Sequence, residues 1–243
     1  MRTGLDVLRD QGWAPLRGLR IGLVCHPASV DQRLAHAADL LAAAPGVHLA
    51  ALFGPEHGYY GQAQDLIGVT DQGDGPSGVR VHSLYGKTFD SLRPTAEQLR
   101  GLDALVIDLQ DVGSRYYTFQ ATMLFCLEAA LANGLTTIVL DRPNPLGGEL
   151  VEGPALQPGF ESFVGIHPVA TRHGLTIGEL ARLYRAERRL TGALTVIPCD
   201  GWRRGADFER TGLPWVLPSP NMPAVETAFV YPGQCLIEGT NLS

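Results

Sequence analysis

The sequence predicts an α/β fold, with a Rossmann-like, mostly parallel sheet and helices on both of its faces. Apolar runs of about one strand length alternate with segments of helical spacing up to residue 199. Several runs are almost continuously apolar, which is typical of strands covered on both faces. Strands that alternate with helices are joined by crossovers, so neighbouring strands should run parallel.

Three strands are expected early in the chain. Residues 20–25 are one apolar run, and residues 29–32 match a capping box that should begin a helix ending near Ala44. Residues 47–53 form the second run. Residues 79–84 form a third, shorter run, which we expect at an edge of the sheet.

A buried helix between two further strands comes next. Residues 95–98 form a second capping box ahead of the apolar run 104–109. Apolar residues then recur at helical spacing at positions 119, 123, 126 and 130, before the run 136–140. This order completes the pattern of a doubly covered parallel sheet.

The sequence pattern changes after Pro143, where the regular alternation of apolar runs and helical segments ends. Residues 143–175 are rich in loops, residues 176–179 form a capping box for a helix to about Leu190, and residues 194–198 predict a last strand of the central type.

The chain is expected to divide near its C-terminal end. We predict a Rossmann-like catalytic domain over residues 1–199. Residues 200–243 are rich in Pro and Gly and should be a loop-rich segment, leading into a second domain that the chain largely lacks.

The composition indicates a folded protein without a broad nucleic-acid surface. The 243 residues are 45% hydrophobic and 18% charged, with a net charge of −6. A nucleic-acid surface needs clustered Lys and Arg, whereas Lys87 is the only lysine. The arginines could still form a local pocket for a carboxylate or phosphate, whose geometry suits the guanidinium group.

No sequence signature implies a metal, an organic cofactor or a membrane span. The glycines of residues 18–22 do not follow the first strand as a dinucleotide site requires, and no P-loop or nucleophile-elbow motif occurs. The four cysteines form no CxxC pair. Apolar stretches are far shorter than the roughly 20 residues of a spanning helix. Because no secretory pattern is visible, we expect a cytoplasmic protein, or a secreted or periplasmic one if a leader has been removed.

Polar side chains collect where the predicted strands end. In open α/β sheets, ligands bind beyond the carboxyl ends of the strands. The residues at these ends are Glu56 and His57 after the second strand, Asp108, Asp111, Arg115, Tyr116 and Tyr117 after the run 104–109, and Asp141, Arg142 and Asn144 after the run 136–140. Their number predicts a cleft at this edge.

Each of these residues also has a structural interpretation, which the sequence leaves open. Glu56 could cap the turn that follows it, and Asp108 and Asp111 could cap helices or orient Arg115. Asp141 and Arg142 could form an internal ion pair. Tyr116 and Tyr117 could be core residues. A metal site of His57, His173 and Asp111 is a further alternative, although the spacing matches no standard metal motif.

Many segments resemble the NamZ (YbbC-like) exo-β-N-acetylmuramidases. The segments are residues 53–58 (FGPEHG), 63–64, 83–86, 108–118 (DLQDVGSRYYT), 140–146 (LDRPNPL), 163–168, 172–180, 218–223 (PSPNMP) and 238–240. The resemblance implies a glycoside hydrolase that releases N-acetylmuramic acid from the non-reducing end of peptidoglycan fragments. It also implies a Rossmann-like N-terminal domain, a smaller C-terminal domain and an active site between them.

The resemblance makes Glu56 the leading catalytic carboxylate. Asp111 and Asp108 are the other catalytic candidates, and muramyl sugars are the expected partners. The expected substrate contacts are His57, Arg115, Tyr116, Tyr117, Asp141, Arg142, Asn144, His173, Asn221 and Glu238.

The chemistry requires an acid and a charge partner for the sugar. An acid must protonate the leaving oxygen, and a second carboxylate (Asp108, Asp111 or Asp141) or the sugar's own acetamido group must support the transition state. The lactyl carboxylate of muramic acid calls for a bidentate arginine, Arg115 or Arg142. Two other functions remain open, a sugar-binding module without turnover and a nucleotide- or phosphate-binding protein.

Overall fold

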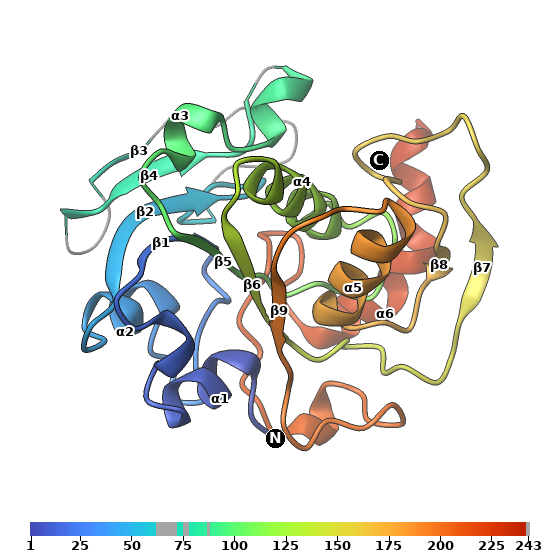
Figure 1. Cartoon of the computed structure of the whole chain (residues 1–243). Coiled ribbons are helices and arrows are strands. Elements are labelled where there is room, and N and C mark those ends of the chain that lie inside the picture. Colours follow the sequence, from blue (N-terminus) through green and yellow to red (C-terminus); the bar gives the residue numbers. More distant parts are fainter. Residues whose placement is uncertain (62–71, 75–77, 87, 242–243) are drawn as a thin grey trace.

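A seven-stranded sheet runs through the middle of the molecule in the computed structural model, which describes residues 1–61, 72–74, 78–86 and 88–241 (Figure 1). The strand order is β3-β4-β2-β1-β5-β6-β9, in which β3 is antiparallel to β4 and the other neighbours are parallel. The strands are β1 (Arg20–Cys25), β2 (His48–Gly54), β3 (Gln72–Asp74), β4 (Arg80–Ser83), β5 (Ala104–Asp108), β6 (Thr136–Leu140) and β9 (Leu194–Ile197). The predicted α/β fold is confirmed.

Helices cover both faces of the sheet (Figure 1). They are α1 (Gly4–Asp10), α2 (Ala37–Ala42), α3 (Ala96–Leu99), α4 (Phe119–Ala132), α5 (Ile177–Glu187) and α6 (Val225–Gln234), with 3₁₀ turns at Ala14–Leu16, Phe89–Leu92, Glu209–Thr211 and Cys235–Gly239. In β5, Ala104 and Val106 pack in one apolar cluster with α1 and α2, whereas Leu105 and Ile107 pack in another with α4 and α5. This alternation is what a strand buried on both faces requires.

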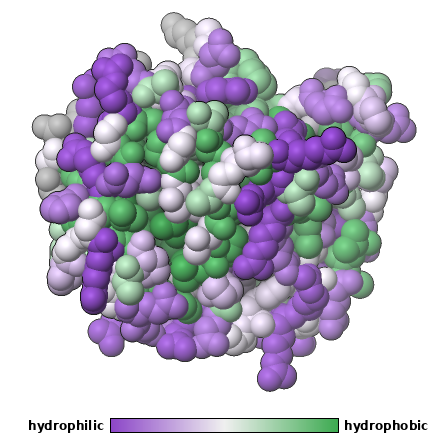
Figure 2. All heavy atoms as spheres, viewed as in Figure 1, coloured by the Kyte–Doolittle hydropathy of each residue, from purple (hydrophilic) through white to green (hydrophobic). Residues whose placement is uncertain are grey.

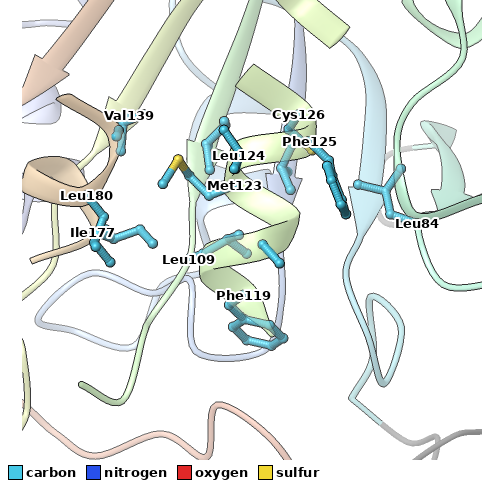
Figure 3. Packing of buried hydrophobic residues seen from close by; sticks show 14 of the residues in the cluster. Leu84, Leu109, Phe119, Met123, Leu124, Phe125, Cys126, Val139, Ile177 and Leu180 are labelled. Atoms are coloured by element: carbon cyan, nitrogen blue, oxygen red, sulfur yellow. The ribbon is translucent and has the colours of Figure 1, made fainter. Parts of the chain in front are cut away.

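Helix α4 lies at the centre of the larger cluster (Figure 3). The positions predicted from helical spacing, Phe119, Met123, Cys126 and Ala130, are all buried. Apolar side chains from β6 and α5, including Val139 and Leu180, surround the helix. A helix that is buried on nearly all sides belongs to a core, and each large side chain buried there contributes about 1.5–3 kcal/mol.

Two of the three predicted capping boxes are confirmed. The Thr95 hydroxyl accepts the Gln98 N–H at the start of α3, and the Thr176 hydroxyl accepts the Glu179 N–H at the start of α5. In both cases the residue three positions on returns a bond to the cap backbone, so two otherwise free donors are satisfied at each helix end.

The capping box predicted at residues 29–32 is wrong. The Ser29 hydroxyl accepts the His26 N–H (3.0 Å) and donates to the Asp108 carbonyl (2.5 Å), so it links the ends of β1 and β5. Helix α2 begins only after His36, whose Nδ1 accepts the Ala38 N–H (3.2 Å). A tertiary bond thus replaces the local cap that the sequence pattern predicts.

Two strand positions also differ from the prediction. The strand expected at an edge, β4, lies between β2 and β3, because three residues that carry no apolar pattern add an antiparallel strand outside it. The strand expected to be central, β9, lies at the opposite edge. Thr195 in β9 is accordingly exposed.

A small second sheet lies in the region predicted as loops. Strands β7 (Glu152–Ala155) and β8 (Ala170–Arg172) pair antiparallel. All residues of β7 are exposed, and the strand contains Gly153 and Pro154, so it lacks the alternation that identifies a half-buried strand.

The segment after residue 200 packs against the rest of the chain. Met222 and Ala228 are buried in the cluster around α4, and the partly buried Trp215 and Tyr231 pack against it. Helix α6 lies beside β8 (Figure 1). This segment therefore contributes to the core of the Rossmann-like fold.

Apolar residues gather in the middle of the face shown in Figure 2, where the sheet lies, and polar residues predominate around its rim.

No helix among the described residues is long and apolar enough to cross a membrane. The thiols of the two cysteines predicted in the core, Cys25 and Cys126, are buried and free.

Candidate active site

The carboxyl ends of β2, β1, β5 and β6 are neighbours in the sheet, so the residues after them share one edge. Glu56 follows β2, His26 follows β1, Asp108 ends β5, and Asp141 follows β6. The structure thus brings the predicted segments together.

Glu56 lies at the tip of a tight turn. The Gly58 N–H donates to the Pro55 carbonyl (2.9 Å), which places Glu56 and His57 at the two central positions. His57 has a φ of 70°, the left-handed conformation that usually favours glycine. A non-glycine residue held there costs of order 1–3 kcal/mol, and such strain concentrates at functional sites.

The carboxylate of Glu56 is held by a residue from the other side of β1. The Thr118 hydroxyl, directly before α4, donates to Glu56 Oε2 (2.7 Å). The next residue, Phe119, packs edge-on against the His26 ring, with centroids 4.8 Å apart. Since β1 separates β2 from β5 in the sheet, this bond fixes Glu56 across the end of the central strand.

His26 supports this edge without carrying charge. Its Nε2 accepts the Gln110 N–H (3.0 Å), so Nδ1 holds the proton and donates to the Pro218 carbonyl (3.2 Å). Burial, and then the charge of Arg142, hold the pKa of His26 well below its usual range. A neutral imidazole therefore ties the C-terminal segment to the ends of β1 and β5.

Asp108 and Arg142 form a buried ion pair. Arg142 Nε lies 2.5 Å from Asp108 Oδ1, and Nη2 lies 2.8 Å from Oδ2. Burial lowers the pKa of Arg142, but the Asp108 carboxylate raises it more, to a net value above the usual one. The internal pair predicted for Arg142 with Asp141 is therefore wrong in its partner, and the bidentate geometry favours a structural role for Asp108 and Arg142.

Asp141 caps helix α5. Its Oδ1 accepts the N–H groups of Gly178 (2.8 Å) and Arg142 (3.0 Å), and Oδ2 accepts the Thr176 hydroxyl (3.0 Å). Burial raises the pKa of Asp141 to about 6 despite these bonds. Its carboxylate is engaged in holding the helix end.

Asp111 and His173 form a second buried pair. Asp111 Oδ2 accepts the Gly113 N–H (2.7 Å) and lies 3.2 Å from His173 Nε2. His173 Nδ1 accepts the Leu175 N–H (3.1 Å), so Nε2 carries the proton and donates to Asp111. Asp111 Oδ1 is buried and has no hydrogen-bond partner among the described residues. Burial, and then the charge of Asp111, raise the pKa of Tyr184, which places this carboxylate near the interior side of α5.

Arg115 and Tyr116 lie together beside the second sheet. Arg115 Nη1 donates to the carbonyls of Pro154 (2.6 Å) and Val169 (2.8 Å), and its guanidinium carbon lies 5.2 Å from the centre of the Tyr116 ring. None of the ion pairs among the described residues includes Arg115. Among the described residues, the groups that balance its buried charge are these carbonyl dipoles and the aromatic face.

Tyr116 lines a largely apolar groove of about 510 Å³ between the β7–β8 sheet and α6. Leu146, Pro154, Phe229 and Leu236 contribute to its walls. Tyr117, in contrast, is buried and packs against aromatic rings of the core. The two tyrosines predicted as substrate contacts thus separate, and the core interpretation is favoured for Tyr117.

The remaining predicted contacts are dispersed. Asn144 donates to the Leu175 carbonyl (3.0 Å) and accepts the Leu146 N–H (2.9 Å), so it shapes its own loop. Asn221 is exposed in a turn. The side chain of Glu238, like residues 63–64 of the sequence motif, lies outside the described residues.

Thr118 is the site residue that is absent from the sequence-based set. A threonine before an apolar helix predicts an N-cap, so its bond to a distant carboxylate leaves no local signal. His26 ends the first of the predicted strands, which places it at the predicted edge, but the sequence assigns it no role. Among the described residues no group of three or more His, Cys, Asp and Glu side chains could hold a metal ion.

Comparison with known proteins identifies the relatives of this chain. The sequence model of the family described as exo-β-N-acetylmuramidase NamZ, N-terminal, matches residues 21–226. A curated relative, the peptidoglycan β-N-acetylmuramidase NamZ of Bacillus subtilis (strain 168), is 50% identical over 243 residues, which are 100% of this chain and 58% of the relative.

Two crystal structures of DUF1343 family proteins from Bacteroides fragilis NCTC 9343 share the fold. BF0371 superposes with a TM-score of 0.89 at 40% identity, over 98% of this chain and 60% of that one. BF0379 gives 0.81 at 31% identity, over 98% and 62%. The chain thus spans about three fifths of the length of these relatives.

Proposed function

Because this chain belongs to the family of N-terminal domains of exo-β-N-acetylmuramidase NamZ, we propose that it carries the catalytic acid of a glycoside hydrolase acting on peptidoglycan fragments. The reaction would release N-acetylmuramic acid from the non-reducing end. The relative that is 50% identical is a peptidoglycan β-N-acetylmuramidase. Since this chain covers 58% of that relative, turnover by the chain itself is part of the proposal.

The observation that carries the proposal is the setting of Glu56. Asp108 is neutralised by Arg142, and Asp141 holds the start of α5. Glu56 instead stands at the tip of a strained turn, and its carboxylate accepts a side-chain hydroxyl from Thr118. It is therefore the strand-end carboxylate best suited to exchange a proton with a substrate.

The first chemical step in this proposal is proton donation by Glu56. The proton moves from the Glu56 carboxyl to the glycosidic oxygen while the bond between that oxygen and the sugar C1 breaks. With Asp108 and Asp141 engaged, and with Asp111 buried and held by the Gly113 N–H and His173, we assign the nucleophile to the carbonyl oxygen of the sugar's acetamido group, which bonds to C1. Water then attacks C1, the acetamido group is restored, and Glu56 recovers a proton from the water.

The charge partner proposed for the lactyl carboxylate is Arg115. The guanidinium of Arg142 already binds Asp108 in bidentate fashion, whereas no ion pair among the described residues involves Arg115. Arg115 also lies against Tyr116, which lines the groove beside this edge. A substrate carboxylate there would supply the counter-charge that the buried guanidinium lacks.

The test is hydrolysis of a chromogenic β-N-acetylmuramide, with the matching β-N-acetylglucosaminide as specificity control. Glu56→Gln should lower kcat by about 10²–10⁴-fold, the usual contribution of a general acid, with an unchanged melting temperature. Glu209→Gln, which alters an exposed carboxyl, is the matched control. Proton NMR should show that the β-anomer is released first, because two displacements retain configuration. Normal turnover by Glu56→Gln would remove Glu56 from the reaction, and inversion would exclude the acetamido route.

A second candidate, sugar binding without turnover, is favoured by one observation. Among the strand-end acids that the structure describes, Asp108 pairs with Arg142, Asp141 caps α5 and Asp111 is held by Gly113 and His173, so none of them forms an acid–nucleophile pair with Glu56. A thermal shift with N-acetylmuramic acid but no hydrolysis of the chromogenic substrate would support binding alone.

A further inference from the structure

Thr118 differs from the other threonines that precede helices in this chain. Thr3, Thr95 and Thr176 each accept a backbone N–H of the helix that follows, as N-cap residues usually do. Thr118 makes no such bond to α4. Its hydroxyl donates instead to Glu56 Oε2, 2.7 Å away.

The conformation of Thr118 explains this difference. An N-cap residue normally has an extended backbone, which turns its side chain toward the helix N–H groups. Thr118 has φ −68° and ψ −14°, which is already helical, and its carbonyl accepts the Thr122 N–H. The preceding turn is fixed by a bond from the Tyr117 N–H to the Ser114 carbonyl (3.0 Å). The backbone on both sides therefore directs the hydroxyl away from its own helix.

A cap that is not made has an energetic consequence. A hydrogen bond to a charged group is stronger than the bond of a Thr cap to a backbone N–H. The bond to Glu56 therefore more than offsets the missing cap when Glu56 is ionised.

We propose that Thr118 is a positioning residue for Glu56, whose hydroxyl fixes Oε2 as an acceptor and leaves Oε1 as the oxygen that gives and recovers the proton. This inference rests on the proposed role of Glu56 as the catalytic acid. A hydroxyl has one hydrogen, and here it is directed at Oε2. The proton that Glu56 transfers must therefore reside on the other oxygen.

The same arrangement stabilises the carboxylate that forms when the proton leaves. Helix α4 is 14 residues long and begins at Phe119, next to Thr118. The partial positive charge at a helix N-terminus favours an anion nearby. The Thr118 hydroxyl and the N-terminus of α4 thus both stabilise the anionic form of the Glu56 side chain.

The variant Thr118→Val tests the proposal, because it keeps the shape of the side chain and removes the donor. It should lower kcat on the chromogenic β-N-acetylmuramide by about 10–100-fold and leave KM within about twofold, because one donor to a charged group is lost. Thr118→Ser, which restores a hydroxyl, should recover most of the rate.

Thr95→Val is the matched control, because it makes the same change at a threonine that caps its own helix. It should lower the melting temperature without changing kcat. A folded Thr118→Val protein with the parent's kcat would overturn the proposal.

A parent chain without turnover would remove the proposed function and leave a separate test of the contact. Melting temperatures of Thr118→Val, Glu56→Ala and the double variant form a double-mutant cycle. Non-additive losses, with recovery in Thr118→Ser, would show that the hydroxyl holds Glu56 in solution. Additive losses would overturn the inference in that case.

Discussion

At the scale of single residues, the arginines and acids of the strand ends have separate tasks that their sequence positions do not distinguish. Arg115 and Arg142 both follow strands and are both buried, yet only one of them has a carboxylate partner among the described ion pairs. The partner of Arg142 is Asp108, which lies 34 positions earlier in the chain. Pairing at such a distance depends on strand order, so it could not be predicted from the sequence.

The two arginines should therefore respond differently to removal. Arg142→Ala leaves the fully buried Asp108 without its counter-charge, and we expect a loss of about 3–5 kcal/mol in the free energy of unfolding. Adding Asp108→Asn should recover part of that loss.

Arg115→Ala should instead reduce the preference for muramide over glucosaminide. Urea denaturation measures the first effect and paired hydrolysis assays the second; equal stability losses in both single variants, with unchanged discrimination, would contradict this division.

At the scale of elements, local chemistry predicts helix starts well when the capping hydroxyl still accepts an N–H of its own helix, as the Thr176 hydroxyl does while it also donates to Asp141. The boxes at Thr95 and Thr176 form as predicted, whereas the hydroxyls of Ser29 and Thr118 bind groups far away in the sequence. Both exceptions lie at the carboxyl edge of the sheet. Local rules thus fail where side chains are used to assemble the candidate site.

The cap of α5 gives this element a pH dependence. The carboxyl of Asp141 has a folded pKa of about 6 against 3.8 for its usual value. Ionisation in the folded state is therefore disfavoured. The stability penalty is absent below pH 3.8, grows as the pH rises toward 6 and is complete above it, reaching at most roughly 3 kcal/mol.

Asp141→Asn should remove this penalty while keeping an amide that can accept a backbone N–H of α5. The stability of the variant relative to the parent should therefore be more favourable at pH 7 than at pH 4, by about 1–3 kcal/mol. Urea unfolding of both proteins at the two pH values measures the difference. The same relative stability at pH 4 and pH 7 would show that Asp141 does not titrate in this way.

At the scale of the whole molecule, hydrophobic patterning predicts the parallel sheet because its central strands are buried on both faces. It does not predict β3, whose three residues form no apolar run. It also does not predict β7 or the edge position of β9, since these two strands have few buried side chains to generate a pattern. It also misses the role of the C-terminal segment, whose contacts come from single residues. Met222 and Ala228 pack around α4, and the Pro218 carbonyl accepts a hydrogen bond from His26 Nδ1.

The boundary that composition predicts at residue 199 should therefore not mark an independently folding unit. A chain shortened to residues 1–199 loses the buried Met222 and Ala228 and the partner of the buried His26. Each large core side chain that is removed costs about 2–5 kcal/mol, against a total stability of about 5–15 kcal/mol for a domain. We expect this chain to lose its cooperative thermal transition in calorimetry.

A chain shortened to residues 1–234 is the matched control, because it removes the end of the same segment, where the described Leu236, Ile237, Thr240 and Asn241 are exposed. Leu236 and Ile237 are 62% and 42% exposed, so their loss uncovers little of the core. This control should keep a cooperative transition within a few degrees of the parent's, because a change of about 1 kcal/mol moves the midpoint of a large domain by only about 2–4 °C. If residues 1–199 melted as cooperatively as the control, the segment after residue 200 would be an appendage, and the edge that presents Glu56 would form without it.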